Sequence, residues 1–331
     1  MKKYFLLLYC VLILISSNAQ PLILLKVKKI YDQSPHAAFT DLTVFKNFLY
    51  CVFREGTGHV PGKTGSDGTI RVLRSKNGKT WDNVAFIKSQ GIDLRDPKIT
   101  VTPQGLLMIN MGGSVYAQGE LKSVSSMVSF SNDGKIFSTP QKINIDPSIA
   151  TSRDWLWRVT WHEQKAFGKV YQFDSGKTGF HLVASDNGLS YTLIKTFDLT
   201  GSPNETTIRF DGTKMLALVR REKENKLGNI GMAEFPYTQW TWQELPIRIG
   251  GPNFLKVGDE FLMATRKYGD ETKTVIGKIS SSGQWAELFV LPSGKDTSYP
   301  GMAIFKNKLF VSYYSGHEEK TSIYLASFKG L

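Results

Sequence analysis

Short runs of apolar residues alternate with polar turns along almost the whole chain. Six times, an apolar strand is followed by a small turn and by a second apolar strand that ends on polar or small residues. These second strands are FLYCVFRE (48–55), GLLMINMGG (105–113), KVYQFDSG (169–176), KMLALVRRE (214–222), EFLMATRKY (260–268) and KLFVSYYSG (308–316). A repeat of about 50 residues built only of strands is typical of a β-propeller. The pattern therefore predicts an all-β fold, a six-bladed β-propeller whose functional site lies at the central funnel.

The repeats also predict where each blade opens onto the funnel. We expect the first strands of the six blades to open near His36, Asp96, Arg158, Glu205, Asn253 and Tyr299. The first two gaps are longer than the others, which predicts loop insertions at 55–68 and 114–124.

One strand lies outside the six repeats. The segment LLKVKKIY (24–31) precedes the first repeat, whereas the sixth repeat ends at Phe328 without a fourth strand. We expect the N-terminal strand to complete the last blade, because this pairing closes the ring and covers an open sheet edge.

The first residues have the pattern of a targeting segment. Two lysines precede an apolar run (4–15) and a short stretch of small polar residues that ends at Ala19. The run is short for a membrane span, and the Leu-Leu-Tyr-Cys sequence that ends at Cys10 lies too early in it for a lipid anchor. We expect a signal peptide at 1–19, a single propeller domain at 20–331, and a periplasmic or secreted protein without lipid.

The net charge indicates which partners to expect, and the cysteine content indicates whether a disulfide can form. The formal net charge is +12, from 41 Lys and Arg against 29 Asp and Glu. There is no dense Lys/Arg run and no nucleic-acid motif, so an anionic glycan is the expected partner rather than nucleic acid. We expect a monomer with no membrane span. After cleavage only Cys51 remains, which excludes an internal disulfide and predicts a buried small hydrophobe.

Three turns share one form: SKNGKTW (75–81), SNDGKIF (131–137) and SDNGLSY (185–191). Each has Ser, a short Asx-Gly turn and an aromatic residue at the same offsets, and Asx side chains bond nearby backbone groups in such turns. These turns resemble the Asp-boxes of the sialidase (neuraminidase) superfamily of six-bladed propellers. In that family they have a structural role and lie far from the site.

The resemblance extends over about the whole chain after residue 19 and implies a set of site residues. Asp67 precedes the strand that leads into the first of these turns, where the family has its acid/base. Glu205 opens a later blade, and Tyr299 opens the last one, where the family has the assisting carboxylate and the nucleophile. The family's substrate-binding arginines correspond to Arg220 or Arg221, and to Arg266.

The chain departs from the family in the first blade. The family opens that blade on Arg-Ile-Pro, and its Arg completes a clamp of three arginines on the carboxylate of sialic acid. Here the stretch is His-Ala-Ala-Phe (36–39), with no Arg. Other cations near blade openings or strand ends are candidates for the substrate-binding set: Arg54, Arg95 and Arg158.

The expected function is that of a sialidase-like retaining exo-glycosidase acting on a terminal acidic sugar. A neutral tyrosine avoids repulsion with an anionic substrate but needs a carboxylate to accept its proton, and sialidases are the exception to the use of two carboxylates by glycosidases. A non-catalytic glycan-binding propeller and an exo-glycosidase for a neutral or sulfated sugar remain alternatives. Histidines 59, 162 and 317 are scattered without metal spacing, so we expect no metal and no cofactor.

Overall fold

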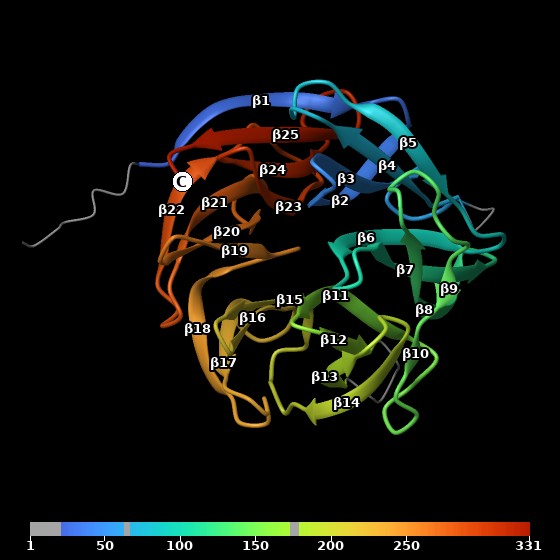
Figure 1. Cartoon of the computed structure of the whole chain (residues 1–331), viewed down its shortest axis with the longest axis vertical. Coiled ribbons are helices and arrows are strands. Elements are labelled where there is room, and N and C mark those ends of the chain that lie inside the picture. Colours follow the sequence, from blue (N-terminus) through green and yellow to red (C-terminus); the bar gives the residue numbers. More distant parts are fainter. Residues whose placement is uncertain (1–20, 63–66, 173–178) are drawn as a thin grey trace, which may run out of the picture.

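The computed structural model describes residues 21–62, 67–172 and 179–331, so the expected signal peptide at 1–19 lies outside the described residues. The described strands form six sheets arranged around a central axis (Figure 1). The predicted six-bladed β-propeller is confirmed. In the part of the chain that the structure describes, no helix is long and apolar enough to cross a membrane.

Each blade is an antiparallel sheet whose first strand lies nearest the axis (Figure 1). Blade one contains β2 (His36–Phe45), β3 (Phe48–Gly56), β4 (Thr69–Ser75) and β5 (Asp82–Ile87). Blade two contains β6 (Asp93–Val101), β7 (Leu107–Ala117), β8 (Glu120–Ser131) and β9 (Gln141–Lys142). Blade three contains β11 (Asp154–His162), β12 (Lys165–Gln172), β13 (Phe180–Ser185) and β14 (Ser190–Thr196), with β10 (Asn144–Ile145) parallel to β14.

The remaining blades follow the same order. Blade four contains β15 (Pro203–Asp211), β16 (Lys214–Arg221), β17 (Leu227–Ala233) and β18 (Thr241–Arg248). Blade five contains β19 (Asn253–Val257), β20 (Glu260–Lys267), β21 (Lys273–Ile279) and β22 (Trp285–Val290). Blade six contains β23 (Thr297–Phe305), β24 (Lys308–Ser315), β25 (Ser322–Lys329) and the N-terminal β1 (Ile23–Tyr31).

The ring closes as the sequence predicts. β1 pairs antiparallel with β25, and Val27 lies opposite Ala326. Figure 1 shows the blue β1 beside the red β25 on the outside of the last blade. Both ends of the chain therefore belong to one sheet, which resists opening of the ring.

One predicted insertion has a different form. Residues 114–124 were expected to form a loop, but most of them continue the β7–β8 hairpin, in which Ala117 pairs with Glu120. The apolar and polar alternation in this stretch is weak, so the length of the hairpin is hidden in the sequence. Residues 57–62, in the other expected insertion, form no strand.

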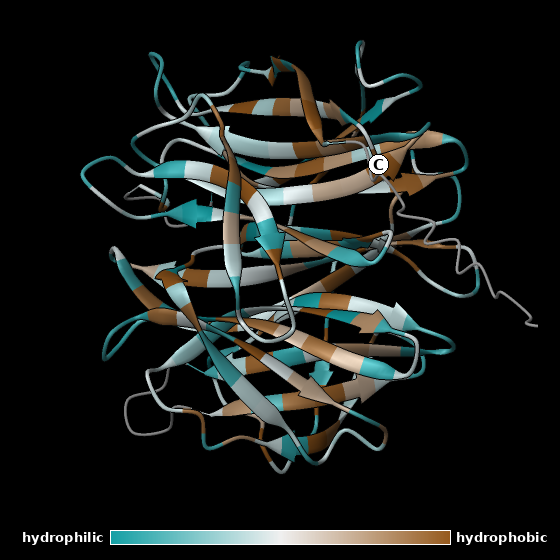
Figure 2. Ribbon diagram, turned by 90° about the vertical axis from the view of Figure 1, so that its left-hand side faces the viewer, coloured by the Kyte–Doolittle hydropathy of each residue, from teal (hydrophilic) through white to brown (hydrophobic). Residues whose placement is uncertain are grey.

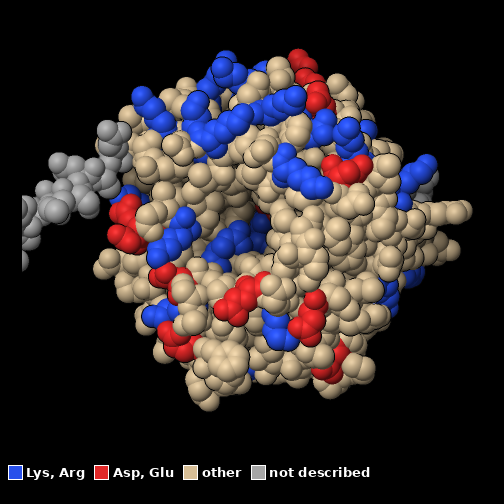
Figure 3. All heavy atoms as spheres, in the orientation of Figure 1, with Lys and Arg blue, Asp and Glu red and all other residues tan. Residues whose placement is uncertain are grey.

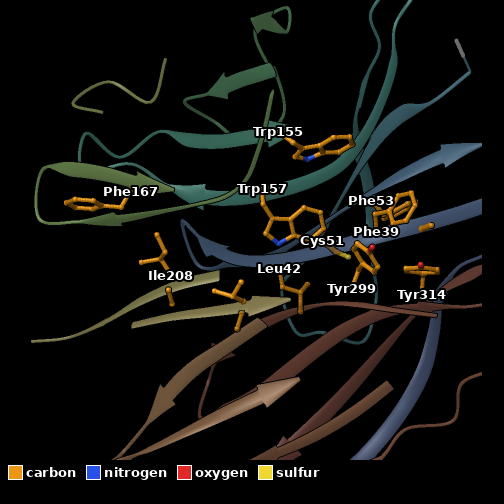
Figure 4. Packing of buried hydrophobic residues seen from close by; sticks show 14 of the residues in the cluster. Phe39, Leu42, Cys51, Phe53, Trp155, Trp157, Phe167, Ile208, Tyr299 and Tyr314 are labelled. Atoms are coloured by element: carbon orange, nitrogen blue, oxygen red, sulfur yellow. The ribbon is translucent and has the colours of Figure 1, made fainter. Parts of the chain in front are cut away.

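Apolar and polar residues alternate along many strands (Figure 2), and the apolar faces pack between neighbouring blades. The cluster nearest the axis is rich in aromatic rings (Figure 4). Trp155 and Trp157 are buried in this cluster, where they act as packing residues. Cys51 is fully buried and unpaired, as predicted.

The three Ser-Asx-Gly turns share nearly the same hydrogen bond and glycine conformation. In each turn the glycine N–H donates to the serine Oγ, over 2.8 Å, 2.9 Å and 2.9 Å in chain order. The glycines adopt φ angles of 71°, 72° and 73°, which disfavour a side chain. These glycines are Gly78, Gly134 and Gly188.

Candidate active site at the centre of the ring

Five of the six inner strands carry an irregularity at the end that faces the funnel. The pairing register of β2, β6, β11, β15 and β23 with the next strand shifts there. A β-bulge bends a strand and re-aims a side chain, and bulges are frequent beside active sites. The shifted segments contain one residue of interest in each blade: Phe39, Asp96, Trp157, Glu205 and Tyr299.

Three of these bulges hold a bulky residue in an uncommon backbone conformation. The φ angles of Phe39, Asp96 and Tyr299 are 63°, 50° and 50°. Positive φ is costly for a residue with a side chain, and such residues cluster at functional sites. Asp96 and Tyr299 each precede a proline, which removes a backbone donor from the ladder and suits a bulge.

The bulges of blades four and six bring Glu205 and Tyr299 into contact. Tyr299 Oη donates a short hydrogen bond to Glu205 Oε1. Arg220 Nη1 lies 2.7 Å from Glu205 Oε2 and donates to Tyr299 Oη over 3.1 Å. The Gly251 N–H donates to Glu205 Oε2 over 2.8 Å. The expected proximity of Glu205 and Tyr299 is therefore observed.

Their surroundings shift the pKa values of Glu205 and Tyr299 in opposite directions. Burial opposes ionisation of Glu205, but Arg220 and the hydrogen bonds outweigh it, so the pKa of Glu205 lies below its usual range. Burial and the negative charge of Glu205 raise the pKa of Tyr299 well above its usual range. At neutral pH the pair is a neutral phenol hydrogen-bonded to a carboxylate, which is the arrangement that lets a carboxylate accept a phenolic proton.

Arg266 lies on the other side of Tyr299. Its guanidinium carbon is 5.2 Å from the centre of the Tyr299 ring, and Nη2 donates to Tyr314 Oη over 2.8 Å. The same Nη2 lies 3.3 Å from Asp296 Oδ1. Arg220 and Arg266 thus flank the Tyr299 ring from neighbouring blades.

Arg54, Arg95 and Asp67 form a second group around Asp93. Arg54 is fully buried, and its Nη2 lies 2.6 Å from Asp93 Oδ1 and 3.1 Å from Asp67 Oδ1. Arg95 Nε lies 3.6 Å from Asp93 Oδ2. Asp67 also accepts hydrogen bonds from the backbone and hydroxyl of Thr57. The structure thus brings Asp67 together with two of the expected arginines.

Two expected arginines lie apart from both groups. Arg158 is buried and paired with Asp41 over 2.6 Å. Arg221 extends away from Tyr299 and bonds to Leu227 O and Glu244. Of the two neighbouring arginines at the end of β16, which the sequence left as alternatives, it is Arg220 that reaches Tyr299.

Sequence reasoning missed two buried groups near Tyr299. Asp96 opened a predicted blade but received no role, and its Oδ1 is buried without a hydrogen-bond partner among the described residues. The Lys98 ammonium lies 4.2 Å from the Trp157 ring and 5.8 Å from the Tyr299 ring, and burial lowers the pKa of Lys98 to about 8. Proline after Asp96, inside a predicted strand, was the signal for the bulge.

Two histidines that are distant in sequence meet one carboxylate. His59 Nδ1 lies 2.7 Å from Asp296 Oδ2, and His36 Nε2 lies 3.7 Å from the same oxygen. The three ligand atoms lie within 4.8 Å of one another, a spacing that could hold a metal ion. Arg266 lies beside Asp296, however, and Arg95 bonds to the His59 carbonyl, so positive charge already surrounds this group.

Figure 3 shows a hollow at the centre of the ring with Lys and Arg atoms inside it. The hollow and the paired groups have the character of a small-molecule site, with few polar groups aimed from several blades.

Known proteins resemble this chain in three-dimensional structure but do not match it in sequence. No family model and no curated protein matches the sequence. A Dyadobacter fermentans protein of unknown function has a TM-score of 0.79 at 19% identity, covering 93% of this chain and 99% of that one. The phage phi92 endosialidase has a TM-score of 0.72 at 11% identity, with coverage of 92% and 69%.

A third similar structure acts on a different sugar. The Penicillium chrysogenum α-L-arabinanase, complexed with arabinobiose, has a TM-score of 0.69 at 15% identity, covering 93% of this chain and 99% of that one. At these identities the likeness is one of fold. The chain therefore has a sialidase-like propeller fold that also occurs in an arabinanase.

Proposed function

We propose that this protein is a retaining glycoside hydrolase that removes a terminal sugar from a glycan, with Tyr299 as the nucleophile. The observation that supports this proposal is the contact of Tyr299 with Glu205, which Arg220 keeps ionised. The sialidase-like fold and the resemblance of the three Ser-Asx-Gly turns to Asp-boxes agree with it. A signal peptide at 1–19 would direct the enzyme to glycans outside the cytoplasm.

The reaction proceeds in two displacements. Tyr299 Oη attacks the anomeric carbon while Glu205 accepts the phenolic proton, and Asp67 donates a proton to the departing oxygen. Water then displaces Tyr299 from the anomeric carbon and gives a proton to Asp67, while Glu205 returns its proton to the phenolate. Two inversions at one carbon give net retention.

The proposal assigns Asp67 the proton transfers on the leaving-group side. Its contacts with Arg54 and Thr57 hold the carboxyl group in place, and Asp67 enters the first step in its protonated form. We expect Asp67→Ala to slow hydrolysis of natural glycosides more than that of aryl glycosides, because an activated leaving group needs no proton.

The test compares two tyrosines that lose the same hydroxyl. Wild type, Tyr299→Phe and Tyr313→Phe are assayed on a panel of 4-methylumbelliferyl glycosides, acidic and neutral. Tyr313 lies in the same blade and donates to Pro292 O, away from the funnel. We expect Tyr299→Phe to lose activity by about 10⁴-fold or more while Tyr313→Phe keeps it.

Other outcomes separate the alternatives. Full activity in Tyr299→Phe would exclude Tyr299 as the nucleophile. A wild type that hydrolyses no glycoside of the panel, yet is retained on immobilised glycans, would establish a glycan-binding propeller instead of an enzyme.

A further inference from the structure

The arginines near Tyr299 are already matched by carboxylates of the protein itself. Arg220 contacts Glu205 over 2.7 Å and also Glu222. Arg248 lies 2.9 Å from the same Glu222. These groups form a continuous chain of two arginines and two carboxylates in blade four, and only small parts of Arg220 and Glu205 reach solvent.

The other arginines around the funnel are paired with carboxylates in the same way. Arg266 pairs with Asp296, and Arg54 and Arg95 share Asp93, with Asp67 as a further partner of Arg54. Among these paired groups, five arginines therefore face five carboxylates: Arg54, Arg95, Arg220, Arg248 and Arg266 against Asp67, Asp93, Glu205, Glu222 and Asp296.

The inner strand of blade one adds an aromatic ring. Its bulge holds Phe39, whose ring centre lies 5.2 Å from that of Tyr299 and whose exposed fraction is 2%. Lys98 also lies near Tyr299, but it is 2% exposed and covered by the Trp157 ring, so it offers no contact to a ligand in the funnel.

Asp96 disfavours a negatively charged ligand. Its Oδ1 is a buried acceptor without a hydrogen-bond partner among the described residues, and Asp96 lies close enough to Glu205 and Tyr299 for their charges to interact. A neutral sugar adds no further negative charge beside these groups, whereas a carboxylate would be repelled by them.

We propose, on the basis of the glycosidase function above, that the sugar bound beside Tyr299 is neutral and carries no carboxylate. An acidic sugar would have to displace an internal ion pair or leave its own charge poorly matched, and removing one partner of a buried pair is costly. Hydroxyl groups, which donate and accept, fit between paired charges. This inference replaces the anionic sugar that the sequence led us to expect.

The test uses pairs of sugars that differ only at C6. Wild type is assayed on two pairs of p-nitrophenyl glycosides, each in both anomers: galactoside with galacturonide, and glucoside with glucuronide. Two further substrates outside these pairs, p-nitrophenyl α-L-arabinofuranoside and 4-methylumbelliferyl N-acetylneuraminide, extend the panel. We expect kcat/KM for the preferred neutral sugar to exceed that for any acidic one by about 10²-fold or more, as for a site with mismatched polar groups. A preference for an acidic member would overturn the inference and leave the glycosidase proposal standing.

A charge variant tests the physical cause. Glu222→Gln leaves Arg220 and Arg248 with one carboxylate fewer, and we expect the acidic-to-neutral ratio of kcat/KM to rise about tenfold. Glu224→Gln removes the same charge beside Arg221, outside this network, and is expected to leave the ratio unchanged. An unchanged ratio in Glu222→Gln, or an equal rise in both variants, would contradict the inference. If wild type neither hydrolyses nor binds any sugar of the panel, the glycosidase proposal fails and this inference fails with it.

Discussion

At one end of the blades three turns repeat a single geometry, whereas at the other end five inner strands bulge around five different side chains. The turns keep the same donor, acceptor and glycine conformation in blades one, two and three. At the funnel, the bulged residues differ in chemical character, from the apolar Phe39 to the acidic Glu205. Repetition at one end secures the ring, and departure from repetition at the other end creates the candidate site.

The regular end also ties neighbouring blades together. Lys306, in the β23–β24 turn, donates to Lys76 O in the first Ser-Asx-Gly turn over 2.9 Å. Lys46, in the equivalent turn of blade one, donates to Asn132 O in the second over 2.6 Å. The first two turns are thus held by the preceding blade, which gives them a structural role that is independent of any ligand.

The largest effect is expected at the funnel end. Glu205→Gln removes the acceptor of the Tyr299 proton, and we expect kcat to fall about 10²–10⁴-fold on the best substrate, with a modest loss of Tm because Arg220 loses one partner of a buried ion pair. Steady-state kinetics and thermal unfolding measure the two quantities. A large loss of Tm with normal kinetics would show that Glu205 belongs with the structural end of the comparison.

The next effect is expected at the turns. In Gly134→Ala the new Cβ would overlap Tyr50 Oη and would adopt a φ of +72°, so we expect a loss of about 1–3 kcal/mol in the free energy of unfolding with unchanged kcat. Gly105→Ala is the matched control, because its φ is +77° but its Cβ would meet open space. Equal losses in the two variants would remove the contact with Tyr50 as a cause.

A buried lysine far from the funnel is expected to be dispensable. Lys169 is fully buried without a hydrogen-bond partner among the described residues, 3.3 Å from the Phe197 ring and 4.4 Å from that of Trp240. Burial lowers the pKa of Lys169 well below its usual value. We expect Lys169→Met to raise the free energy of unfolding by about 1 kcal/mol at neutral pH, and by more in acid, without changing kcat. Denaturant unfolding at two pH values checks this, and a destabilised variant would show that the cation–ring contacts outweigh burial.

The smallest effect concerns Lys98, beneath the Tyr299 ring. Its pKa is about 8 in the folded chain and 10.5 as an ordinary lysine, so the unfolded chain binds more protons between these values. Its contribution to stability therefore rises as the pH increases from about 8 to 10.5. We expect the free energy of unfolding of wild type, relative to that of Lys98→Met, to increase as the pH rises over this interval. Parallel curves for the two proteins would indicate an unshifted lysine.

The sequence predicted the repeats well because apolar periodicity and Asx-Gly turns are local signals. It placed blade openings at Asp96, Glu205 and Tyr299, where the structure has bulges. It could not choose between Arg220 and Arg221, since adjacent residues of a strand point to opposite faces and a bulge upstream changes which face is the funnel.

Pairings across the ring were beyond the sequence. His36, His59 and Asp296 meet although up to 260 residues separate them. The matching of each funnel arginine by a carboxylate is likewise a property of three-dimensional neighbours, which a count of charges along the chain does not contain. Roles for Asp67, Glu205 and Tyr299 came from the family resemblance and await the kinetic tests.

The pairing of β1 with β25 also sets an order of events during synthesis. Lys26 and Ser327 bond across 301 positions of the chain, so the strand that leaves the ribosome first acquires its partner only when the last strand has been made. Contacts of such sequence separation form slowly. Blades one to five can form in sequence as the chain grows, while β1 keeps an open edge until the end. Synthesis of β25 must therefore precede the final step of folding, and loss of either β1 or β25 would leave the same blade unfinished.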